Sequence, residues 1–385
     1  RRRGVVLVTN TMAVGGAQRQ ILLWLRQRAA AYAPVRLVVL TGGGAWEAAA
    51  AALGAEIEVV EANLGRTAAG RFLLWAMPRC AYVFGLWRGL RRMRPQAVWS
   101  WLFLANVVAA PAARLAGVPR LVISERAQSE WKRRDRGGLW WYRPSERAAA
   151  AVSDAVVVNS RAAARDYANW LGCPSEQIQV IVNGVDSTHW SPARASPARV
   201  PRPDGPVVLS VGRLSPEKGH ATLLGVSRRL RQEAVPHRLV LVGGGELEDS
   251  LEALASELGI ADRVVFAGEL ADPLECYRAA DVFVLPSITE SMPNALMEAL
   301  LCGLPAVTTD AGGASEVVVD GETGFVVPVG DEAAFASALK ILLEDPDLRR
   351  RMGEAGRRRM LEVFSVERMA RAMDEVFGEL GVASQ

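Results

Sequence analysis

The sequence has few residues of the kinds that build disulfide scaffolds and zinc sites. Its 385 residues include four cysteines, and no two of them form a Cys-x-x-Cys pair. Cysteines spaced this widely are typical of reduced thiols inside the cell and argue against a disulfide framework or a zinc site. Only three histidines occur, His189, His220 and His237, and none lies in the core of the first half.

Long apolar runs are also missing. The best candidate for a membrane span, Ala97–Ala113, contains Ser100, Asn106 and Pro111. It is about one turn short of the roughly 20 residues that a spanning helix needs, and a strand followed by a helix fits it better. Residues 1–9 pass from three arginines into an apolar strand without the cleavage site of a signal peptide. We therefore expect a cytoplasmic protein.

The dinucleotide fingerprint Gly-x-Gly-x-x-Gly does not follow the first strand or the glycine run 242–246, which argues against a nicotinamide enzyme. Low-complexity segments and fixed-period repeats are absent as well. What the chain does contain is an alternation of short β-rich runs with helical stretches, the signature of parallel sheets with crossover helices. The predicted strands are Gly4–Thr9, Val35–Leu40, Ala97–Trp101, Arg120–Ile123, Ala155–Asn159, Val207–Val211, Leu239–Val242, Val264–Ala267, Val282–Leu285, Ala306–Thr308 and Phe325–Val327.

The length exceeds what one hydrophobic core usually supports, so we expect an α/β protein of two doubly wound, Rossmann-like domains. Residues 183–206 are rich in Pro, Ser and Arg and predict a linker. The predicted domains are residues 1–190 and 191–365. A last helix within residues 366–385 is expected to pack back on the first domain.

The two halves differ strongly in charge. Residues 1–200 carry 27 Lys and Arg against 12 Asp and Glu, a net charge of +15, whereas the remainder carries 18 against 30, a net charge of −12. A basic half favours an anionic partner such as phospholipid, a phosphorylated lipid carrier or nucleic acid.

Four predicted strand-end loops of the second half carry polar chemistry. In open parallel sheets, ligands bind beyond the carboxyl ends of the strands, where loops lead into helix N-termini that attract phosphate. In the first loop, Val211–His220, Gly212 allows close backbone approach. Arg213 offers a planar fork to diphosphate oxygens, and Lys218 adds a second positive charge. A solvated polar loop is the alternative interpretation.

The second and fourth loops are less specific. The glycine run Val242–Glu246, with Gly244 as the candidate donor-binding residue, fits close approach to a ligand, but any tight turn uses glycine. The fourth loop, Thr308–Glu316, leads through paired glycines into a helix and could complete the wall around a sugar. Glu316 is equally well explained as a first-turn helix charge.

The third loop, Pro286–Glu298, is the most specific. Pro293 suits the first turn of a helix, so Glu290 precedes the helix and Glu298 lies about one and a half turns inside it. The two carboxylates can accept hydrogen bonds from sugar hydroxyls and from a ribose diol, while the first helix amides point at phosphate. Pairs of glutamates eight residues apart are common, and the alternative role of Glu290 is to interact with the dipole at the N-terminus of the helix. The candidate donor-binding residues here are Glu290, Ser291, Met292, Pro293, Asn294, Ala295, Leu296 and Glu298.

Together these residues resemble glycosyltransferase family 4, retaining enzymes of the GT-B fold, over nearly the whole chain. The most specific part is the Glu-x7-Glu spacing of Glu290 and Glu298, followed by GLPAVTTDAGGASEVVVDGETGFVVP. The resemblance extends to the glycine loop Gly15–Arg19 and to Val182–Asp186.

The resemblance implies two domains facing a cleft, with Arg213 and Lys218 on the donor diphosphate, Glu298 on the ribose and Glu290 beside the donor sugar. Arg213, Lys218 and Glu290 are then the catalytic residues. The donor is expected to be a UDP-sugar by family frequency, and no cofactor or metal is expected because the cations stabilise the leaving diphosphate. Asp345-Pro346-Asp347 is predicted to cap a helix rather than to bind a metal.

On the first domain, the resemblance places Gly15, Gly16 and Gln18 on the side of the cleft that faces the acceptor. The chain departs from the family in two ways: Ser291 stands where many members have glycine, and no histidine is available on a strand-end loop of this domain. Glu125 or Arg126 is expected to occupy the place of that histidine.

The acceptor is predicted to be a lipid-linked or cell-envelope glycan. Residues 62–124 contain nine arginines and no acidic residue. Arginines beside aromatic residues suit the interface of an anionic membrane. A solvated basic helix with core-facing aromatics is the alternative, and nucleic acid is not expected because no binding motif accompanies the charge. The aromatic residues are Phe72, Trp75, Tyr82, Phe84, Trp87, Trp99, Trp101 and Phe103, and a second cluster comprises Trp131–Arg134 and Trp140–Arg143.

Three other functions fit the same fold. A sugar-nucleotide epimerase needs acid and base carboxylates, and a pyridoxal-dependent phosphorylase needs a cofactor lysine, for which Lys218 and Lys340 are the only candidates in the second half. A non-catalytic sugar-nucleotide-binding or scaffold protein is the third alternative, and the intact pair of Glu290 and Glu298 argues against it.

Overall fold

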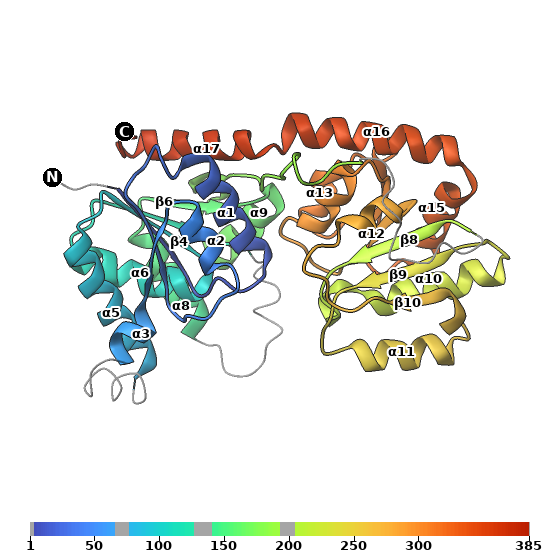
Figure 1. The fold of residues 1–385 in the computed structure, drawn as a ribbon, viewed down its shortest axis with the longest axis horizontal. Coiled ribbons are helices and arrows are strands. Elements are labelled where there is room, and N and C mark those ends of the chain that lie inside the picture. The colour runs from blue at the N-terminus through green and yellow to red at the C-terminus, as the bar shows by residue number, and fades with distance from the viewer. Residues whose placement is uncertain (1–3, 66–76, 127–140, 193–204, 385) are drawn as a thin grey trace. The chain divides into compact units, whose positions relative to one another are not determined.

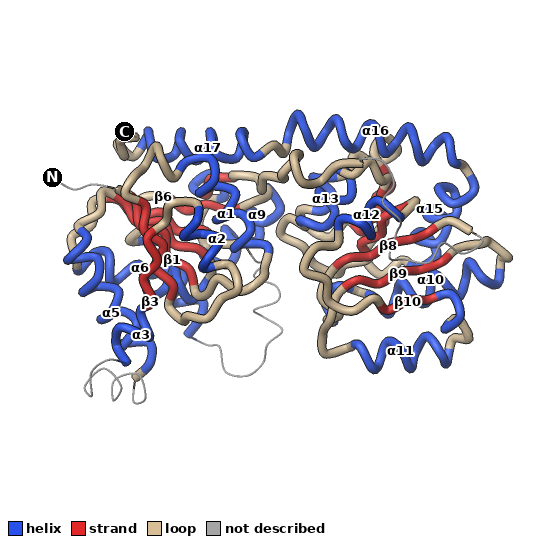
Figure 2. Tube along the Cα trace, viewed as in Figure 1, coloured by secondary structure: helices blue, strands red, loops and turns tan. Residues whose placement is uncertain are grey.

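The computed structural model describes residues 4–65, 77–126, 141–192 and 205–384. The chain divides into two compact units. Unit 1 comprises Arg1–Gly184 and Val366–Gln385, and unit 2 comprises Val185–Ser365. Each is a parallel β-sheet with helices on both faces (Figures 1 and 2). The two sheets confirm the predicted α/β class with two Rossmann-like domains.

The sheet of unit 1 has the strand order β3-β2-β1-β4-β5-β6-β7. Alternate residues of its strands face opposite helix layers: Val5 and Leu7 of β1 pack with α1 and α17, whereas Val6 and Val8 pack with α5 and α6. The strands are β1 (Val5–Thr9), β2 (Val35–Val39), β3 (Glu56–Val59), β4 (Ala97–Trp101), β5 (Arg120–Ser124), β6 (Ala155–Val158) and β7 (Ile178–Val180). The helices are α1 (Gly16–Arg28), α2 (Glu47–Ala52), α3 (Val60–Gly65), α5 (Pro78–Met93), α6 (Phe103–Leu115), α8 (Tyr142–Ala151), α9 (Arg161–Leu171), η2 (Ser175–Gln177) and α17 (Val366–Glu379).

The sheet of unit 2 has the order β10-β9-β8-β11-β12-β13. Because β8 is first in sequence yet central, the strand order reverses between β8 and β11, which creates a topological switch point. The strands are β8 (Val207–Val211), β9 (Arg238–Val242), β10 (Val264–Phe266), β11 (Val282–Leu285), β12 (Ala306–Thr309) and β13 (Gly324–Val327). The helices are η3 (Pro216–Lys218), α10 (His220–Gln232), α11 (Glu248–Glu257), η4 (Ala261–Arg263), α12 (Leu274–Ala279), α13 (Asn294–Leu301), α14 (Ala314–Val317), α15 (Glu332–Glu344) and α16 (Pro346–Val363).

The last helix, α17, completes the core of unit 1 although it follows unit 2 in sequence. It runs beside α1 (Figure 1). Its Phe377 is fully buried against Trp24, Tyr32 and Trp99. On the outer side of the contact, Asp374 accepts hydrogen bonds from the guanidinium of Arg28 and from the hydroxyl of Tyr32.

Three strands match the prediction residue for residue: β4, β8 and β11. The sequence analysis did not predict β3 and β7. Both lie at edges of the sheet of unit 1, where one side of a strand has no neighbour, so fewer apolar residues are needed. In β3 the glutamates Glu56 and Glu58 interrupt the run of apolar residues that would indicate a strand. β7 is only three residues long.

The structure divides the chain six residues earlier than expected, at Gly184 and Val185 rather than after residue 190. The amide of Val185 donates to the carbonyl oxygen of Phe364 at 2.9 Å, and the ring of Trp190 packs on Tyr277. These contacts tie the segment to unit 2. Half of the predicted linker, residues 193–204, lies outside the described residues.

Ala97–Ala113 forms a strand and a helix, as predicted. Among the helices that the structure describes, none combines the length and apolar character that crossing a bilayer requires. The Asp345 carboxylate accepts a hydrogen bond from the amide of Leu348 at 2.8 Å and caps α16, which confirms its predicted capping role.

Candidate functional site

Four loops meet at the carboxyl edge of the sheet of unit 2, around the switch point between β8 and β11. The loops after β8 and β9 are in backbone contact: the amide of Leu214 donates to the carbonyl oxygen of Gly244 at 3.0 Å. A Cβ atom on Gly243, whose φ is +139°, would lie 2.0 Å from the carbonyl oxygen of Gly212. Gly243 is therefore required for the packing of one loop on the other. A Cβ on Gly212 or Gly244 would instead meet only side chains, at 3.8 Å or more: Lys218 beside Gly212, and Glu248 and Glu269 beside Gly244.

The loops after β8 and β11 are joined more tightly. The amide of Ile288 donates to the carbonyl oxygen of Glu217 at 2.8 Å. Gly219 adopts a φ of +68°, and a Cβ there would lie 2.1 Å from the carbonyl oxygen of Pro286. This close approach requires glycine and brings the end of η3 against the third loop.

An ion pair connects these two loops. The Nζ of Lys218 donates to Oε1 of Glu290 at 2.6 Å, and Oγ of Ser287 donates to the same oxygen at 2.8 Å. The Glu290 side chain is only 9 % exposed, whereas that of Lys218 is 25 % exposed. A nearly buried carboxylate needs such partners because its desolvation is costly. Because the Lys218 side chain is partly exposed, a ligand can reach it from solvent.

Glu298 lies in the second turn of α13 and is 3 % exposed. Its Oε2 accepts a hydrogen bond from the hydroxyl of Tyr277 at 3.0 Å. Tyr277 comes from α12, and the sequence analysis did not include it among the candidate residues. No spacing pattern links positions 277 and 298, because α12 and α13 meet only through the fold.

Helix α13 starts one residue later than predicted. Pro293 is the residue before the helix, with φ −79° and ψ 110°, and Asn294 is its first residue. Ser291 and Met292 are buried, Asn294 and Ala295 are half-buried, and Leu296 is buried in the core. The first amides of α13 thus emerge beside Glu290, where the helix dipole favours an anion.

The fourth loop is tied to the third. The amide of Gly313 donates to the carbonyl oxygen of Glu290 at 3.0 Å. The hydroxyl of Thr309 donates to the carbonyl oxygen of Ser287 at 2.5 Å. Glu316 stands in the first turn of α14, and its carbonyl oxygen accepts from Arg359. The loop therefore holds the backbone around Glu290 in place.

Arg213 is exposed, and within the described residues its guanidinium has no hydrogen-bond or ion-pair partner. His220, the first residue of α10, is buried beside Lys218. Burial and the positive charge of Lys218 lower the pKa of His220 to about 4, so its imidazole is neutral near pH 7. The positive charge of this edge is therefore carried by Arg213 and Lys218.

The predicted residues of unit 1 lie at the carboxyl edge of its own sheet. Gly15 precedes α1 and Gly16 begins it. The Gln18 amide nitrogen donates to the carbonyl oxygen of Thr11 at 3.2 Å. A Cβ on Gly15 would lie 2.6 Å from the Gln18 amide oxygen, so glycine makes room for this side chain.

Glu125 and Arg126 follow β5. Glu125 is buried, and the Arg126 guanidinium stacks 4.3 Å from the Trp101 ring while Nη1 donates to Oδ1 of Asn183 at 2.9 Å. Burial lowers the pKa of Arg126 to about 9, opposed by the negative charge of Glu125. Nε and Nη2 of Arg126 are buried and have no hydrogen-bond partner in the described part of the chain.

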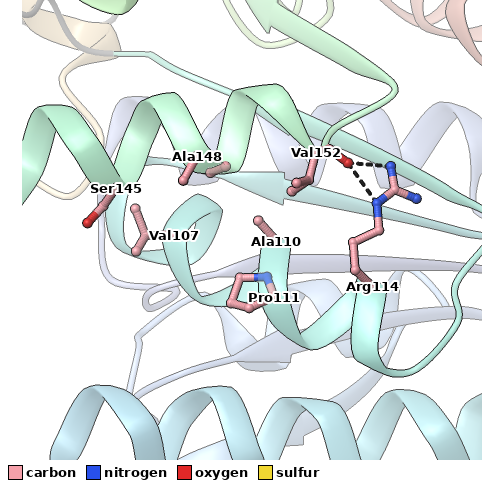
Figure 3. Close-up of a pocket in the computed structure, with 8 residues that line it drawn as sticks. Val107, Ala110, Pro111, Arg114, Ser145, Ala148 and Val152 are labelled. Atoms are coloured by element: carbon pink, nitrogen blue, oxygen red, sulfur yellow. Dashed lines mark hydrogen bonds between the residues drawn. The ribbon is translucent and has the colours of Figure 1, made fainter.

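Unit 1 also holds a cavity of about 310 Å³ between α6 and α8. At one end of it, Arg114 donates to the carbonyl oxygen of Val152 at 2.7 Å (Figure 3). None of the predicted site residues lines this cavity, which is surrounded by Val107, Ala110, Pro111, Arg114, Ser145, Ala148, Ala149 and Val152. Elsewhere in the described residues, no group of three or more His, Cys, Asp or Glu side chains is placed to hold a metal ion.

Two protein-family models match the chain. The model of Glycosyltransferase Family 4 matches residues 14–189, and that of Glycosyl transferases group 1 matches residues 194–359. Together they span the site residues of both units.

Curated relatives agree with these models. The chain is 34 % identical over 279 residues to a GDP-mannose-dependent α-(1-6)-phosphatidylinositol monomannoside mannosyltransferase of Mycolicibacterium smegmatis, covering 68 % of this chain and 71 % of the relative. It is 35 % identical over 220 residues to a D-inositol 3-phosphate glycosyltransferase of Nocardia farcinica, covering 54 % of this chain and 49 % of that protein.

Among solved structures, the fold is similar to that of Anabaena Alr3699/HepE in complex with UDP and glucose, with a TM-score of 0.82 and 22 % identity. This match covers 98 % of the present chain and 100 % of the other. Sucrose-phosphate synthase from Thermosynechococcus elongatus matches with a TM-score of 0.80 and 22 % identity, covering 99 % of each chain.

Proposed function

Because the chain belongs to glycosyltransferase family 4, we propose that it transfers a sugar, with retention of configuration, from a nucleoside-diphosphate sugar to a lipid-linked or cell-envelope glycan. It is a transferase of the GT-B fold. One observation carries the proposal: Lys218 and Glu290 meet at the switch point of unit 2, with Glu298 eight residues further on in α13.

In the proposed complex, the donor diphosphate lies against Arg213, Lys218 and the first amides of α13. Glu298 accepts hydrogen bonds from the ribose, and Glu290 lies beside the sugar. As the bond between the anomeric carbon and the diphosphate oxygen breaks, the cations and amides stabilise the charge that grows on the leaving group. The acceptor hydroxyl oxygen bonds to the anomeric carbon on the same face, and its proton passes to the departing phosphate oxygen. These cations support a reaction without a metal requirement.

We propose UDP as the nucleotide, which is supported by the fold similarity to HepE in complex with UDP and glucose. GDP is the second candidate, since the mycobacterial relative is named as GDP-mannose-dependent. The base is expected to bind near Gly212 and Gly244, where the absence of a side chain lets a ligand approach the backbone.

Thermal unfolding with UDP, GDP, ADP and NAD, each with and without chelator, tests the donor site. A ligand at about 100 times its dissociation constant should stabilise the protein by about 2.7 kcal/mol. We expect a clear shift with one nucleoside diphosphate that the chelator leaves unchanged. Absence of a shift with every nucleotide would contradict the donor site, and a shift that disappears with chelator would contradict metal independence.

The lipid-linked acceptor is supported by the outer face of α5. Phe84 is 44 % exposed and lies 5.5 Å from the ring of Trp87, over which Arg91 is stacked. Arg88 is also exposed. Trp99 and Trp101 are instead buried in the core, so for those two residues the core interpretation is correct. Phe72, Trp75, Trp131–Arg134 and Trp140 lie outside the described residues.

Vesicle sedimentation tests this face of α5. A variant with Phe84→Ser, Arg88→Gln and Arg91→Gln should bind phosphatidylglycerol vesicles more weakly, by about 1 kcal/mol for each arginine removed. The matched control is Arg350→Gln with Arg351→Gln, two exposed arginines on α16 of unit 2. Equal loss in the control, or no binding by the unaltered protein, would contradict the membrane-surface proposal.

A further inference from the structure

Tyr277 is a buried residue that the proposed mechanism has not yet used. It is fully buried in α12, and its hydroxyl donates at 3.0 Å to Oε2 of Glu298. Glu298 is the carboxylate that the proposed function places on the donor ribose.

The ring of Tyr277 is held between aromatic neighbours. Trp190 meets it edge-on, with ring centroids 5.4 Å apart and planes at 89°, and Phe283 of β11 lies 5.9 Å away. The next residue, Arg278, donates to the carbonyl oxygen of Ser191 at 3.0 Å and to its hydroxyl at 3.2 Å. The helix that carries Tyr277 is therefore fixed on the segment 190–191, and the hydroxyl has little freedom to move.

A glutamate that is to bind a vicinal diol must present its oxygens in one defined plane. The terminal torsion of a glutamate side chain is broad, so the carboxylate plane is poorly fixed by the side chain itself. A charge-assisted hydrogen bond to one oxygen defines that plane, and it leaves further lone pairs on the carboxylate for hydroxyl donors.

We infer that Tyr277 is a positioning residue for nucleotide recognition: it orients the Glu298 carboxylate so that the carboxylate accepts hydrogen bonds from the ribose hydroxyls of the donor nucleotide. The inference rests on the proposed function, since it takes Glu298 as the ribose partner. It predicts that the Tyr277 hydroxyl contributes to affinity only when the ribose carries its hydroxyls.

The test compares binding of UDP and 2′,3′-dideoxy-UDP by calorimetry, with GDP and its dideoxy form if the thermal shifts select GDP. Tyr277→Phe keeps the ring and removes only the hydroxyl. We expect it to weaken UDP binding by about five- to tenfold while leaving dideoxy-UDP binding nearly unchanged. In turnover assays, KM for the donor should rise with kcat nearly constant.

Two further variants separate the possible outcomes. Phe283→Leu disturbs the packing of the same ring but keeps the hydroxyl, so it should lower thermal stability without changing the ratio of the two affinities. In Glu298→Gln the affinities for UDP and dideoxy-UDP should become nearly equal. Adding Tyr277→Phe to that variant should not change the ratio of the two affinities further. If Tyr277→Phe leaves the ratio of UDP to dideoxy-UDP affinity unchanged while Glu298→Gln brings it close to one, the inference is overturned and the proposed function stands. If Glu298→Gln keeps the ratio of the unaltered protein, both are overturned.

Discussion

The Lys218→Met variant should lose about 10²- to 10³-fold in kcat, the effect typical of removing one preorganised charge partner from a developing anion. Methionine has a similar length but no charge, so the leaving diphosphate loses the stabilisation that the ammonium group supplies. Glu290 keeps the hydrogen bond from Ser287 in this variant. The loop therefore retains the Ser287 contact to Oε1. Because removing one partner of a nearly buried ion pair also lowers stability, kcat is measured well below the unfolding temperature of the variant.

Lys340→Met is the matched control for this prediction. Lys340 is the other lysine of unit 2, and on the surface it pairs with Glu233 at 2.9 Å. Exposed pairs of this kind contribute little, about 0–1 kcal/mol, to stability. Steady-state kinetics with the donor identified by thermal shift should show the control at the rate of the unaltered protein. A Lys218→Met variant as active as the control would contradict the assignment of Lys218 to the diphosphate.

The second large effect is on stability. Phe377→Ala should destabilise unit 1 by about 3–5 kcal/mol, the usual cost of deleting a fully buried phenylalanine side chain. Phe377 lies 6.4 Å from Trp24, 5.2 Å from Tyr32 and 5.9 Å from Trp99, measured between ring centroids. Its removal leaves a cavity between α17, α1 and the sheet.

Urea unfolding followed by tryptophan fluorescence measures this change. Ten of the eleven tryptophans belong to unit 1, and only Trp190 belongs to unit 2, so the signal reports mainly on unit 1. Glu375→Ala, on the exposed side of the same helix, should stay within about 0.5 kcal/mol of the unaltered protein. If Phe377→Ala unfolds at the same urea concentration as this control, α17 is not part of the core of unit 1.

Much of the fold follows from local pattern. The central strands β4, β8 and β11 were predicted at their observed bounds, because strands covered on both faces are short, nearly continuous apolar runs. The edge strands β3 and β7 escaped prediction, because an edge strand with polar residues carries no such signal. The division between the units also depends on contacts, since Val185 pairs with Ser365, far away in sequence.

Only part of the candidate site could be predicted from the sequence. Gly212, Lys218 and Glu290 stand out because they lie in the loops that follow strands, where a parallel sheet binds ligands. Glu298 stands out by its spacing of eight residues from Glu290. The contact between Lys218 and Glu290 joins residues 72 apart, so only the reversal of strand order at β8 brings them together.

The sequence by itself determined the class of fold, the order of the strands along the chain and the candidate residues, because these depend on local periodicity and composition. The tertiary structure alone decided which candidates touch. It paired Lys218 with Glu290, placed Tyr277 on Glu298, left Arg213 exposed and buried Trp99 and Trp101 in the core. Such contacts arise when elements distant in sequence pack to bury apolar surface, and no local pattern in the chain records that packing.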